Sequence, residues 1–467
     1  MKLTQTSLIT SYEIFLKNSI EETAKTKKPN QLLSFCFTLP NEFFKDNLPL
    51  LLKDCEDGFY SFANGEELLA IGNIFSLIAA GAKRWNIIEK EYTKLPEPLF
   101  NSREPQFIDA PQFITTVKFS EEKQSEEWSG FKNIEFYIPK FLVKSESGSL
   151  LFRFNEMLSP TFAAENSVSE FKTSLNNIFA DLKANDDEVH FNYETDFDLS
   201  KEKETWNRKV EQSLVEIKRN ALTKIVLARK ISLSIKSPIP FEVLPGKLIK
   251  ANPSANIFFI KKNDSVFLGA SPEILIELQN DTIRTEAIAG SRKRGSTPEE
   301  DFLLENELFN SDKERNEHNS VVDFLVSHMT NLASVVHYDK TPTIKKLTSI
   351  QHLSTLVTAR LKFGSSIFSL IDKIFPTPAV CGSPKEKAMK LISELEDFDR
   401  GLYAGLIGWF SPSSVKLTVA IRSALINKNT IFVYAGCGIV EGSNPESEFA
   451  ETETKFKTIL SAFNEKS

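Results

Sequence analysis

Apolar and polar residues alternate along much of the chain, and this pattern predicts many β-strands joined by tight turns. Residues 59–72 alternate on both sides of Asn64-Gly65, which readily adopts the positive φ angles of a two-residue turn. Residues 257–271 repeat the pattern around Asn263-Asp264. Both segments are therefore expected to be hairpins. Further strands are predicted at residues 107–114, 149–155, 223–235, 350–361, 398–410, 415–426 and 430–440.

Helices are predicted where apolar residues recur at helical spacing and where capping residues precede them. Ser200 is the expected N-cap of a helix with an apolar stripe made of Trp206, Val210, Leu214 and Ile217. Thr297, Pro298 and Glu300 have the spacing of another helix start. Other helices are expected at residues 74–82, 165–183, 311–325 and 446–460.

Residues 184–204 are polar and acidic, and they are the best candidate for a boundary within the chain. Such a boundary would separate a variable N-terminal part, residues 1–200, from a denser C-terminal part, residues 201–467. The same stretch is equally compatible with a surface loop inside one large fold. The pattern alone leaves both interpretations open.

Composition places the chain among globular proteins that can bury a sizeable core. Of its 467 residues 41% are hydrophobic and 25% charged, and the 38 phenylalanines favour wide sheets with aromatic cores. The net charge of −7 argues against nucleic acid as the main partner, so an anionic substrate needs local positive charge or a metal ion.

Cysteine usage and the absence of long apolar segments indicate the cellular compartment in which the protein is expected. The four cysteines form no CxxC pair, which is typical of reduced thiols rather than of a disulfide or zinc framework. The sequence shows no signal peptide and no run of 18 apolar residues. A cytoplasmic protein without a membrane segment is therefore expected.

Residues 267–293 contain the first candidate chemistry. Glu273 follows Pro272 at the end of one predicted strand, and Gly290 and Ser291 end the next. A carboxylic acid beside glycine-lined backbone N–H groups would suit acid catalysis on an anionic substrate. The alternative is an ordinary hairpin with a surface glutamate.

Two helices carry carboxylates three residues apart, a spacing that puts both on one helical face. Glu314 and Glu317 form one pair, and Glu448 and Glu451 the other, with Lys455 one turn beyond Glu451. If the pairs faced each other, they would form an all-oxygen site suited to Mg²⁺. The alternative is two solvated helix faces.

Further candidates lie on predicted strands. Lys224 could be a base if its strand faces a closed pocket, because burial favours the neutral amine, or it could simply end an edge strand. Arg422 could bind a carboxylate through two hydrogen bonds or point to solvent. The remaining candidates have structural alternatives as core or bulge residues: His352, Tyr403, Tyr434, Gly436 and Gly438.

In series, these motifs resemble the chorismate-utilising enzymes, namely anthranilate synthase component I and the aminodeoxychorismate, salicylate and isochorismate synthases. The matching runs, from Leu222 to the C-terminus, are KIVLAR, GASPE, IAGSRKRG, DKERNEH, QHLST, PTPAVCG, FDRGLYAG, AIR, YAGCGIV and ESEFAETETK. The resemblance implies a single large α+β fold, in which two antiparallel β-sheets pack as a sandwich with helices outside.

Within that family, the resemblance implies water rather than ammonia as the nucleophile. Isochorismate and salicylate synthases have a lysine where Lys224 stands, whereas the aminating members usually have glutamine. Ala289 stands where aminodeoxychorismate synthases carry a nucleophilic lysine, and the chain lacks the LLES-like stretch of tryptophan-binding anthranilate synthases. The expected protein is thus an isochorismate synthase, serving menaquinone or siderophore synthesis as a monomer without a glutaminase subunit.

The resemblance also implies a role for each candidate residue. Glu317 and Glu451 would hold Mg²⁺, with Glu314 and Glu448 behind them. Lys224 would take a proton from the water that attacks C2, and Glu273 would protonate the departing C4 hydroxyl. Roles in substrate binding would fall to Arg422, Tyr434, Gly436, Gly438 and Lys455 at the carboxylates, to Gly290 and Ser291 near the C4 oxygen, and to His352 by the ring carboxylate.

Two candidate positions resemble different members of the family. Tyr403 stands where salicylate synthases have tyrosine and some isochorismate synthases have phenylalanine. Ala379 matches the isochorismate synthases, since salicylate synthases tend to have threonine there. A salicylate synthase that also eliminates pyruvate is therefore the first alternative. The second, from another class, is a catalytically silent homologue that binds a ligand or a partner.

Overall fold

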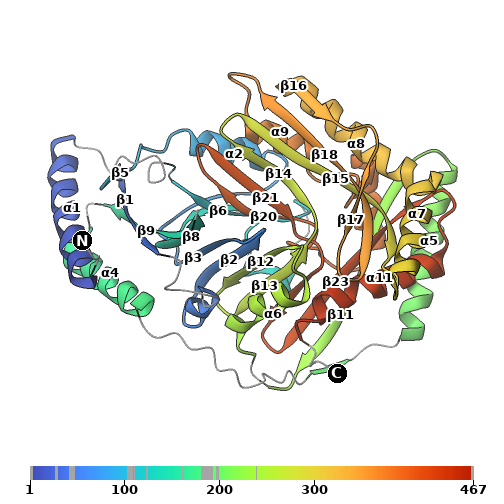
Figure 1. Ribbon diagram of the computed structural model, residues 1–467, viewed down its shortest axis with the longest axis horizontal. Coiled ribbons are helices and arrows are strands. Elements are labelled where there is room, and N and C mark those ends of the chain that lie inside the picture. Colours follow the sequence, from blue (N-terminus) through green and yellow to red (C-terminus); the bar gives the residue numbers. More distant parts are fainter. Residues whose placement is uncertain are drawn as a thin grey trace.

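Two large β-sheets face each other across the main hydrophobic core, with helices outside them (Figure 1). The computed structural model describes residues 4–463 apart from 27–29, 41–47, 103–108, 110, 122–124, 147, 160, 180–192, 196–198 and 238. This architecture confirms the predicted α+β sandwich. Neighbouring strands in the described sheets are antiparallel with one exception. At one edge of the first sheet, β1 (Gln31–Pro40) and β5 (Leu99–Phe100) run parallel, with Leu33 opposite Leu99.

The first sheet contains thirteen strands within the described residues. Their order is β10 (Tyr193–Thr195), β11 (Lys224–Ile235), β23 (Thr430–Val440), β22 (Ser423–Asn427), β13 (Ser265–Ser271), β12 (Asn256–Lys262), β2 (Asp57–Ala63), β3 (Glu66–Ile71), β8 (Phe141–Glu146), β9 (Ser149–Leu158), β1 (Gln31–Pro40) and β5 (Leu99–Phe100), with β19 (Gly382–Ser383) beside β11.

The second sheet contains ten strands in the described part of the chain. Their order is β16 (Ala333–Tyr338), β18 (Ile350–Leu361), β15 (Thr282–Lys293), β14 (Ile274–Gln279), β21 (Ser414–Val419), β20 (Leu406–Phe410), β6 (Phe113–Val117), β7 (Ile134–Ile138) and β4 (Phe75–Ala79), with β17 (Thr343–Lys346) beside β18.

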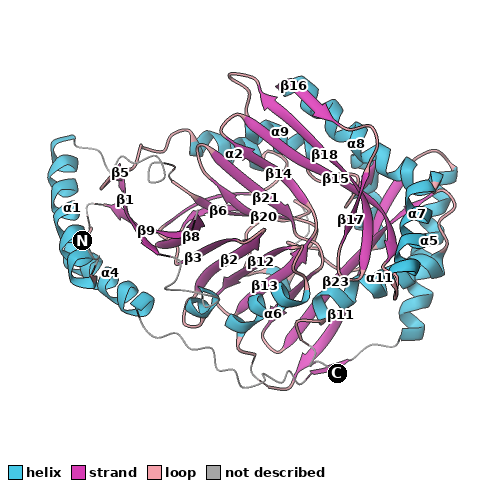
Figure 2. Cartoon of the chain, viewed as in Figure 1, coloured by secondary structure: helices cyan, strands magenta, loops and turns pink. Residues whose placement is uncertain are grey.

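The helices cover the outer faces and one end of this sandwich. They are α1 (Gln5–Thr26), α2 (Arg84–Tyr92), α4 (Ala164–Phe179), α5 (Leu199–Lys218), α6 (Leu244–Ala251), α7 (Pro298–Asn310), α8 (Asp312–Leu332), α9 (Ile367–Ile374), α10 (Lys385–Leu395) and α11 (Pro445–Leu460), with short 3₁₀ turns η2 (Leu48–Leu52), η3 (Glu126–Trp128) and η4 (Phe241–Val243). Figure 2 shows α5, α7 and α11 gathered at the end where β11 and β23 lie.

The N-terminal and C-terminal parts of the chain share both sheets. Strand β2 pairs with β12 in the first sheet, and β6 pairs with β20 in the second. The boundary predicted at residues 184–204 falls largely outside the described residues. Because of the β2–β12 and β6–β20 pairings, backbone hydrogen bonds join the N-terminal and C-terminal parts within the same two sheets.

Both predicted hairpins are confirmed, as β2–β3 and β12–β13, with Asn64 and Asn263 at positive φ. Three other predictions were wrong, at residues 74–82, 398–410 and 415–426. The last segment forms two strands rather than one, β21 in the second sheet and β22 in the first, with Arg422 at a φ of +52° in the turn between them. Residues 74–82 form strand β4 and not a helix: Leu77 and Ala79 are buried while Ile78 points outwards, so the short apolar run follows a period of two.

The second wrong prediction concerns residues 398–410, expected to be one strand. Only β20, from Leu406, is extended, and the preceding residues form turns. Gly401 has φ of +53°, and a Cβ there would lie 2.1 Å from the Trp128 ring. The turn that this glycine permits carries Tyr403 to the site described below.

Helix starts were predicted with partial success. Thr297 caps α7, accepting the backbone N–H of Glu300, as the sequence predicts. Ser200 lies in the first turn of α5 rather than at its cap, and the buried side of that helix consists of Trp206, Val210, Ser213 and Ile217. Leu214 is only partly buried beside this stripe. Helix α4 covers the described part of the predicted helix 165–183.

None of the helices in the described parts of the chain is long and apolar enough to cross a membrane.

Candidate active site

A polar pocket lies between the two sheets at the end covered by α8 and α11, and its unfilled space, including the part open to solvent, is about 690 Å³. Thirteen of the sixteen predicted site residues line it: Lys224, Glu273, Gly290, Ser291, Glu317, His352, Ala379, Tyr403, Arg422, Gly436, Gly438, Glu451 and Lys455. The fold therefore brings together side chains that are separated by up to 231 positions in sequence, Lys224 to Lys455.

Lys224 is the first residue of β11, and its side chain is buried in the interior of the sheet. It pairs with Val440 of β23 on one side and with Ser383 of β19 on the other, so the exposed-edge interpretation was wrong. Its Nζ donates a hydrogen bond to Glu317 Oε1 at 2.7 Å. This hydrogen bond gives the buried amino group a polar partner and so offsets the cost of its burial.

Gly438 makes room for that ion pair. A Cβ at this position would lie 2.8 Å from Lys224 Cε and 3.0 Å from Glu317 Oε1. Gly436 similarly allows the Tyr403 hydroxyl to approach, since a Cβ there would lie 2.9 Å from it. The two glycines of β23 thus form a flat wall of the pocket without side chains.

Glu273 sits at a corner where the chain passes from one sheet to the other. Strand β13 of the first sheet ends at Ser271, and β14 of the second begins at Ile274. The Glu273 backbone N–H donates to Ser271 Oγ at 3.1 Å, and its carbonyl oxygen accepts from the Val419 N–H at 3.0 Å. Both hydrogen bonds fix the direction in which its side chain enters the pocket.

Burial sets the protonation of Glu273. Its side chain has 5% exposure, and desolvation raises its pKa to about 7 even though the charge of Lys224 acts to lower it. Thr377 Oγ1 lies 3.5 Å from its Oε1, a contact at the outer limit of a hydrogen bond. The carboxylic acid form is therefore well populated near neutral pH, as a general acid requires.

Four glutamates from α8 and α11 approach the opposite end of the pocket. Glu317 and Glu451 line it, whereas Glu314 and Glu448 lie behind them. Glu314 accepts the Ser291 N–H at 3.1 Å and also contacts Arg292, and Glu448 lies 3.4 Å from Lys313. Burial and then the charge of Glu317 raise the pKa of Glu314; burial and then Glu451 raise the pKa of Glu448.

This carboxylate group is not a ready-made metal cage. Within the described residues, no three His, Cys, Asp or Glu side chains lie close enough together to hold a metal ion by themselves. Instead Lys224 contacts Glu317, and Lys455 contacts Glu451 at 2.6 Å. The donor set nevertheless fits Mg²⁺, which is commonly bound by one or two carboxylates, waters and substrate oxygens.

Arg422 and His352 form a second cationic feature of the pocket. His352 Nδ1 lies 3.1 Å from the Gly290 carbonyl oxygen, which can only accept, so Nδ1 carries the proton. Its Nε2 then accepts from Arg422, 3.4 Å away. Burial, followed by the charges of Arg422 and Lys455, lowers the pKa of His352 to about 3. The imidazole is neutral and orients the Arg422 guanidinium.

Three predicted residues do not line the pocket: Tyr434, Glu314 and Glu448. Tyr434 is fully buried behind Tyr403, whose ring stacks on it at 5.1 Å with an interplanar angle of 17°. The prediction that Tyr434 contacts substrate is therefore not supported by its position, because the Tyr403 ring stands in between. Tyr434 shapes the pocket through that ring.

Sequence reasoning missed Cys437, which lines the pocket, and three residues that lie around it. Thr377 was assigned only to a loop, although its place between two prolines in PTPAVCG holds its hydroxyl near Glu273. Cys437 lies between the two predicted glycines that line the pocket. Lys345 and Glu286, which contact the Glu273 corner, follow no motif and gave no signal.

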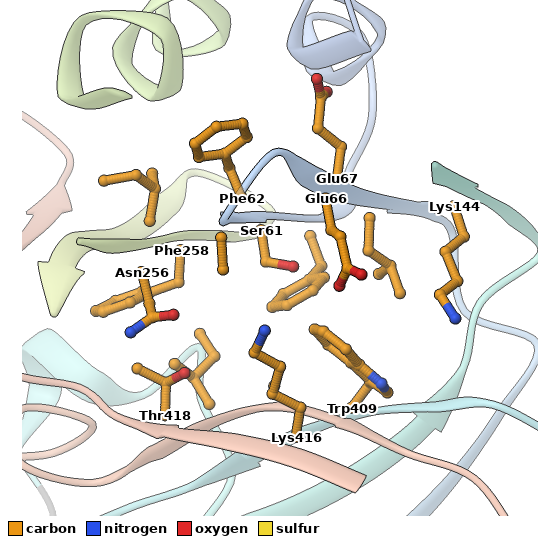
Figure 3. Close-up of a pocket in the computed structure, with 16 residues that line it drawn as sticks. Ser61, Phe62, Glu66, Glu67, Lys144, Asn256, Phe258, Trp409, Lys416 and Thr418 are labelled. Atoms are coloured by element: carbon orange, nitrogen blue, oxygen red, sulfur yellow. The ribbon is translucent and has the colours of Figure 1, made fainter. Parts of the chain in front are cut away.

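A second pocket, with about 460 Å³ of unfilled space, opens farther along the sandwich (Figure 3). It shares no residue with the first, and its walls come from β2, β3, β8, β12, β20 and β21. Figure 3 shows Lys416 beside the Trp409 ring, and Lys416 lies 3.7 Å from Glu277. None of the predicted acid, base or metal-binding residues is in this pocket.

Comparison with known proteins agrees with the geometry. A family model described as chorismate binding enzyme matches residues 18–464. Isochorismate synthase MenF of Bacillus subtilis is 35% identical over 354 residues, covering 73% of this chain and 72% of that protein. Anthranilate synthase component 1 of Saccharolobus solfataricus is 35% identical over 269 residues, covering 57% of this chain and 63% of that protein.

Solved structures share the fold. The menaquinone-specific isochorismate synthase MenF from Escherichia coli superposes with a TM-score of 0.77 at 22% identity, covering 96% of this chain and all of that one. Anthranilate synthase component I from Streptococcus pneumoniae superposes with a TM-score of 0.66 at 22% identity, covering 92% of each chain. At this identity the structural likeness concerns the fold.

Proposed function

Because the chain belongs to the chorismate-binding enzyme family, we propose that it is an isochorismate synthase, which moves the hydroxyl function of chorismate from C4 to C2 using water. One observation carries the proposal: a buried lysine amino group, Lys224, and a buried carboxyl whose pKa is raised to about 7, Glu273, line the same pocket. Relatives named as isochorismate synthases support the same choice.

The proposed reaction needs one base and one acid. The Lys224 amine takes a proton from water as the water oxygen forms a bond to C2. The ring double bonds shift, the bond between C4 and its oxygen breaks, and Glu273 gives its proton to that oxygen, so that water leaves. Protons and atoms balance, since Lys224 gains one proton and Glu273 loses one. The resting states return when the two groups exchange these protons with solvent.

The other pocket residues have binding roles in this proposal. Arg422, oriented by His352, and Lys455, which donates to the Gly436 carbonyl oxygen at 2.8 Å, bind the two carboxylates of the substrate. Gly290 and Ser291 contact the C4 oxygen, and Ala379 leaves space beside the ring. The glycine wall of β23 lets the ring approach the backbone.

A magnesium ion, when bound, would be held by Glu317 and Glu451, and it would supply positive charge to neutralise the ring carboxylate. Glu314 and Glu448 would stand behind these two ligands. Lys224 and Lys455 are the hydrogen-bonding partners of these two ligands, at 2.7 and 2.6 Å.

The salicylate synthase alternative rests on Tyr403, whose ring lines the pocket. A pyruvate elimination would follow isochorismate formation there. The two functions differ in product, so product analysis separates them. We also propose that the protein works in the cytoplasm, as a monomer, and without an ammonia-supplying subunit.

The test is an incubation of purified protein with chorismate and Mg²⁺ in the absence of ammonia, followed by chromatography. Isochorismate as the sole product is the expected result. Salicylate with pyruvate would favour the alternative function. Unchanged chorismate would contradict both and would indicate a silent homologue. Size-exclusion chromatography of the same sample checks the monomer.

A further inference from the structure

The corner that carries Glu273 is held by a cluster of side chains outside the pocket. Lys345 of β17 donates from its Nζ to the carbonyl oxygen of Pro272 at 2.9 Å, and Pro272 directly precedes Glu273. The same Nζ contacts Glu286 Oε2 of β15 at 2.6 Å. Ser354 of β18 donates to the other oxygen, Glu286 Oε1, at 2.5 Å.

These contacts join three neighbouring strands of the second sheet to the peptide that crosses between the sheets. Strands β15 and β17 both pair with β18, so Glu286 and Lys345 lie on the two strands that flank it. Their side chains are about one-quarter exposed, at 22% and 24%, so their charges are only partly screened. Pro272 lies between β13 and β14, outside both strands, and its carbonyl oxygen accepts the hydrogen bond from Lys345.

We propose that Lys345 and Glu286 are positioning residues for Glu273. Lys345, paired with Glu286, holds the Pro272 carbonyl oxygen in place, and the pair keeps one positive and one negative charge beside the acid. The inference rests on the proposed function, in which Glu273 is the proton donor. It adds two residues that do not line the pocket and that no motif identifies.

The pKa of Glu273 depends on the charged groups that face its carboxyl. They are Lys224 from β11, Glu286 from β15, Lys345 from β17 and Arg422 from the turn before β22. Desolvation dominates the protonation of Glu273; Glu286 favours its neutral form, and Lys345 favours its ionised form. Because Lys345 and Glu286 are paired, their effects oppose each other, and removal of either one leaves the other unbalanced.

The test compares Lys345→Met and Glu286→Gln with a matched control, Lys346→Met. Lys346 is the next residue of β17, but it contacts Asp301 at 3.0 Å and Glu305 at 2.7 Å and so lies away from the corner. Glu273 titration is followed by ¹³C NMR on glutamate labelled at the side-chain carboxyl carbon. Its resonance is assigned as the one that Glu273→Gln removes.

The expected result is a pair of opposite shifts. Lys345→Met raises the pKa of Glu273, because a cation is lost, and Glu286→Gln lowers it, because an anion is lost. With chorismate, both variants lower kcat by about tenfold, equal to ~1.4 kcal/mol, with little change in KM. Lys346→Met changes neither quantity. A purely structural role would not move the titration in two directions.

Two outcomes would overturn the inference: shifts of the same sign, or variants that match Lys346→Met. If wild-type protein leaves chorismate unchanged, the proposed function fails, but the NMR titration still decides whether the pair controls Glu273. If Lys345→Met does not fold, as judged by circular dichroism, the Glu286→Gln titration decides, because it keeps the lysine that holds the Pro272 carbonyl.

Discussion

The pocket contains two glutamates whose pKa values are shifted in opposite directions. At the corner between the sheets, Glu273 is buried, and desolvation raises its pKa to about 7. At the helix end, burial acts in the same direction on Glu451, but the ion pair with Lys455 and the charge of Arg422 hold its pKa below the ordinary value. One residue type thus supplies an acid at one end and an anion at the other.

This difference shows that neighbours, rather than residue type, assign the roles. Glu451 lies 2.6 Å from the amino group of Lys455, whereas the Glu273 carboxyl lies 3.5 Å from the neutral hydroxyl of Thr377. A proton donor and a cation-binding carboxylate need these opposite environments. The following predictions test the comparison, from the largest expected effect to the smallest.

Removal of the base or the acid should have the largest effect. We expect Lys224→Ala and Glu273→Gln each to lower kcat by about a thousandfold or more, since general acid and base groups contribute roughly 10²–10⁴-fold. Steady-state assays with chorismate measure the loss, and circular dichroism checks the fold. Near-normal turnover in either variant would remove that residue from its role.

Loss of the anionic end should weaken magnesium binding. Glu451→Gln is expected to reduce Mg²⁺ affinity by more than the roughly 10–100-fold typical of groups outside the ligand set. Titration calorimetry with Mg²⁺ measures this without turnover. Glu446→Gln is the matched control, because Glu446 lies on the same helix with its side chain exposed. Equal affinities in the two variants would contradict the assignment of Glu451.

The glycine wall should tolerate no side chain beside Lys224. In Gly438→Ala the new methyl would crowd Lys224 Cε and Glu317 Oε1, displacing the base by a fraction of an ångström. We expect kcat to fall by about ten- to a hundredfold, since small misplacements of catalytic groups are costly. Gly246→Ala, in open space on α6, is the control. An unchanged kcat in Gly438→Ala would show that the pocket adapts.

The buried acid should also reduce stability at alkaline pH. A carboxyl with a raised pKa in the folded state contributes full stability below its unfolded pKa, and this is lost as pH rises through about 7. Glu273→Gln should therefore be more stable than wild type at pH 8, by on the order of 3 kcal/mol, and nearly equal at pH 4. Thermal melts at both pH values measure the gap. A constant difference would contradict the raised pKa.

The sequence was most informative where a local pattern has one physical meaning. Turn dipeptides such as Asn64-Gly65 require positive φ, and both hairpins formed as expected. The acid, base and carboxylate positions came from motif resemblance, and the fold places Lys224, Glu273, Glu317 and Glu451 in one pocket. The ordered series of motifs was thus sufficient to predict which acidic and basic side chains meet in the pocket.

The sequence was least informative where tertiary contacts determine the secondary structure of a segment or the position of a side chain. The short run at Leu77 is apolar enough for a helix or a strand, and its pairing with Phe136 of β7 decides for the strand. Tyr434 and Tyr403 look equivalent in sequence, but only stacking shows which ring faces the pocket. Lys345 acts through a backbone carbonyl 73 residues away, a contact that no local pattern encodes.

The most direct measurement is the origin of the oxygen at C2 of the product. Purified protein is incubated with chorismate and Mg²⁺ in water enriched in ¹⁸O, and isochorismate is analysed by mass spectrometry and NMR. The account predicts one ¹⁸O atom per molecule, located at C2, with the C4 oxygen released. Unlabelled isochorismate, or no isochorismate at all, would contradict attack by water between Lys224 and Glu273.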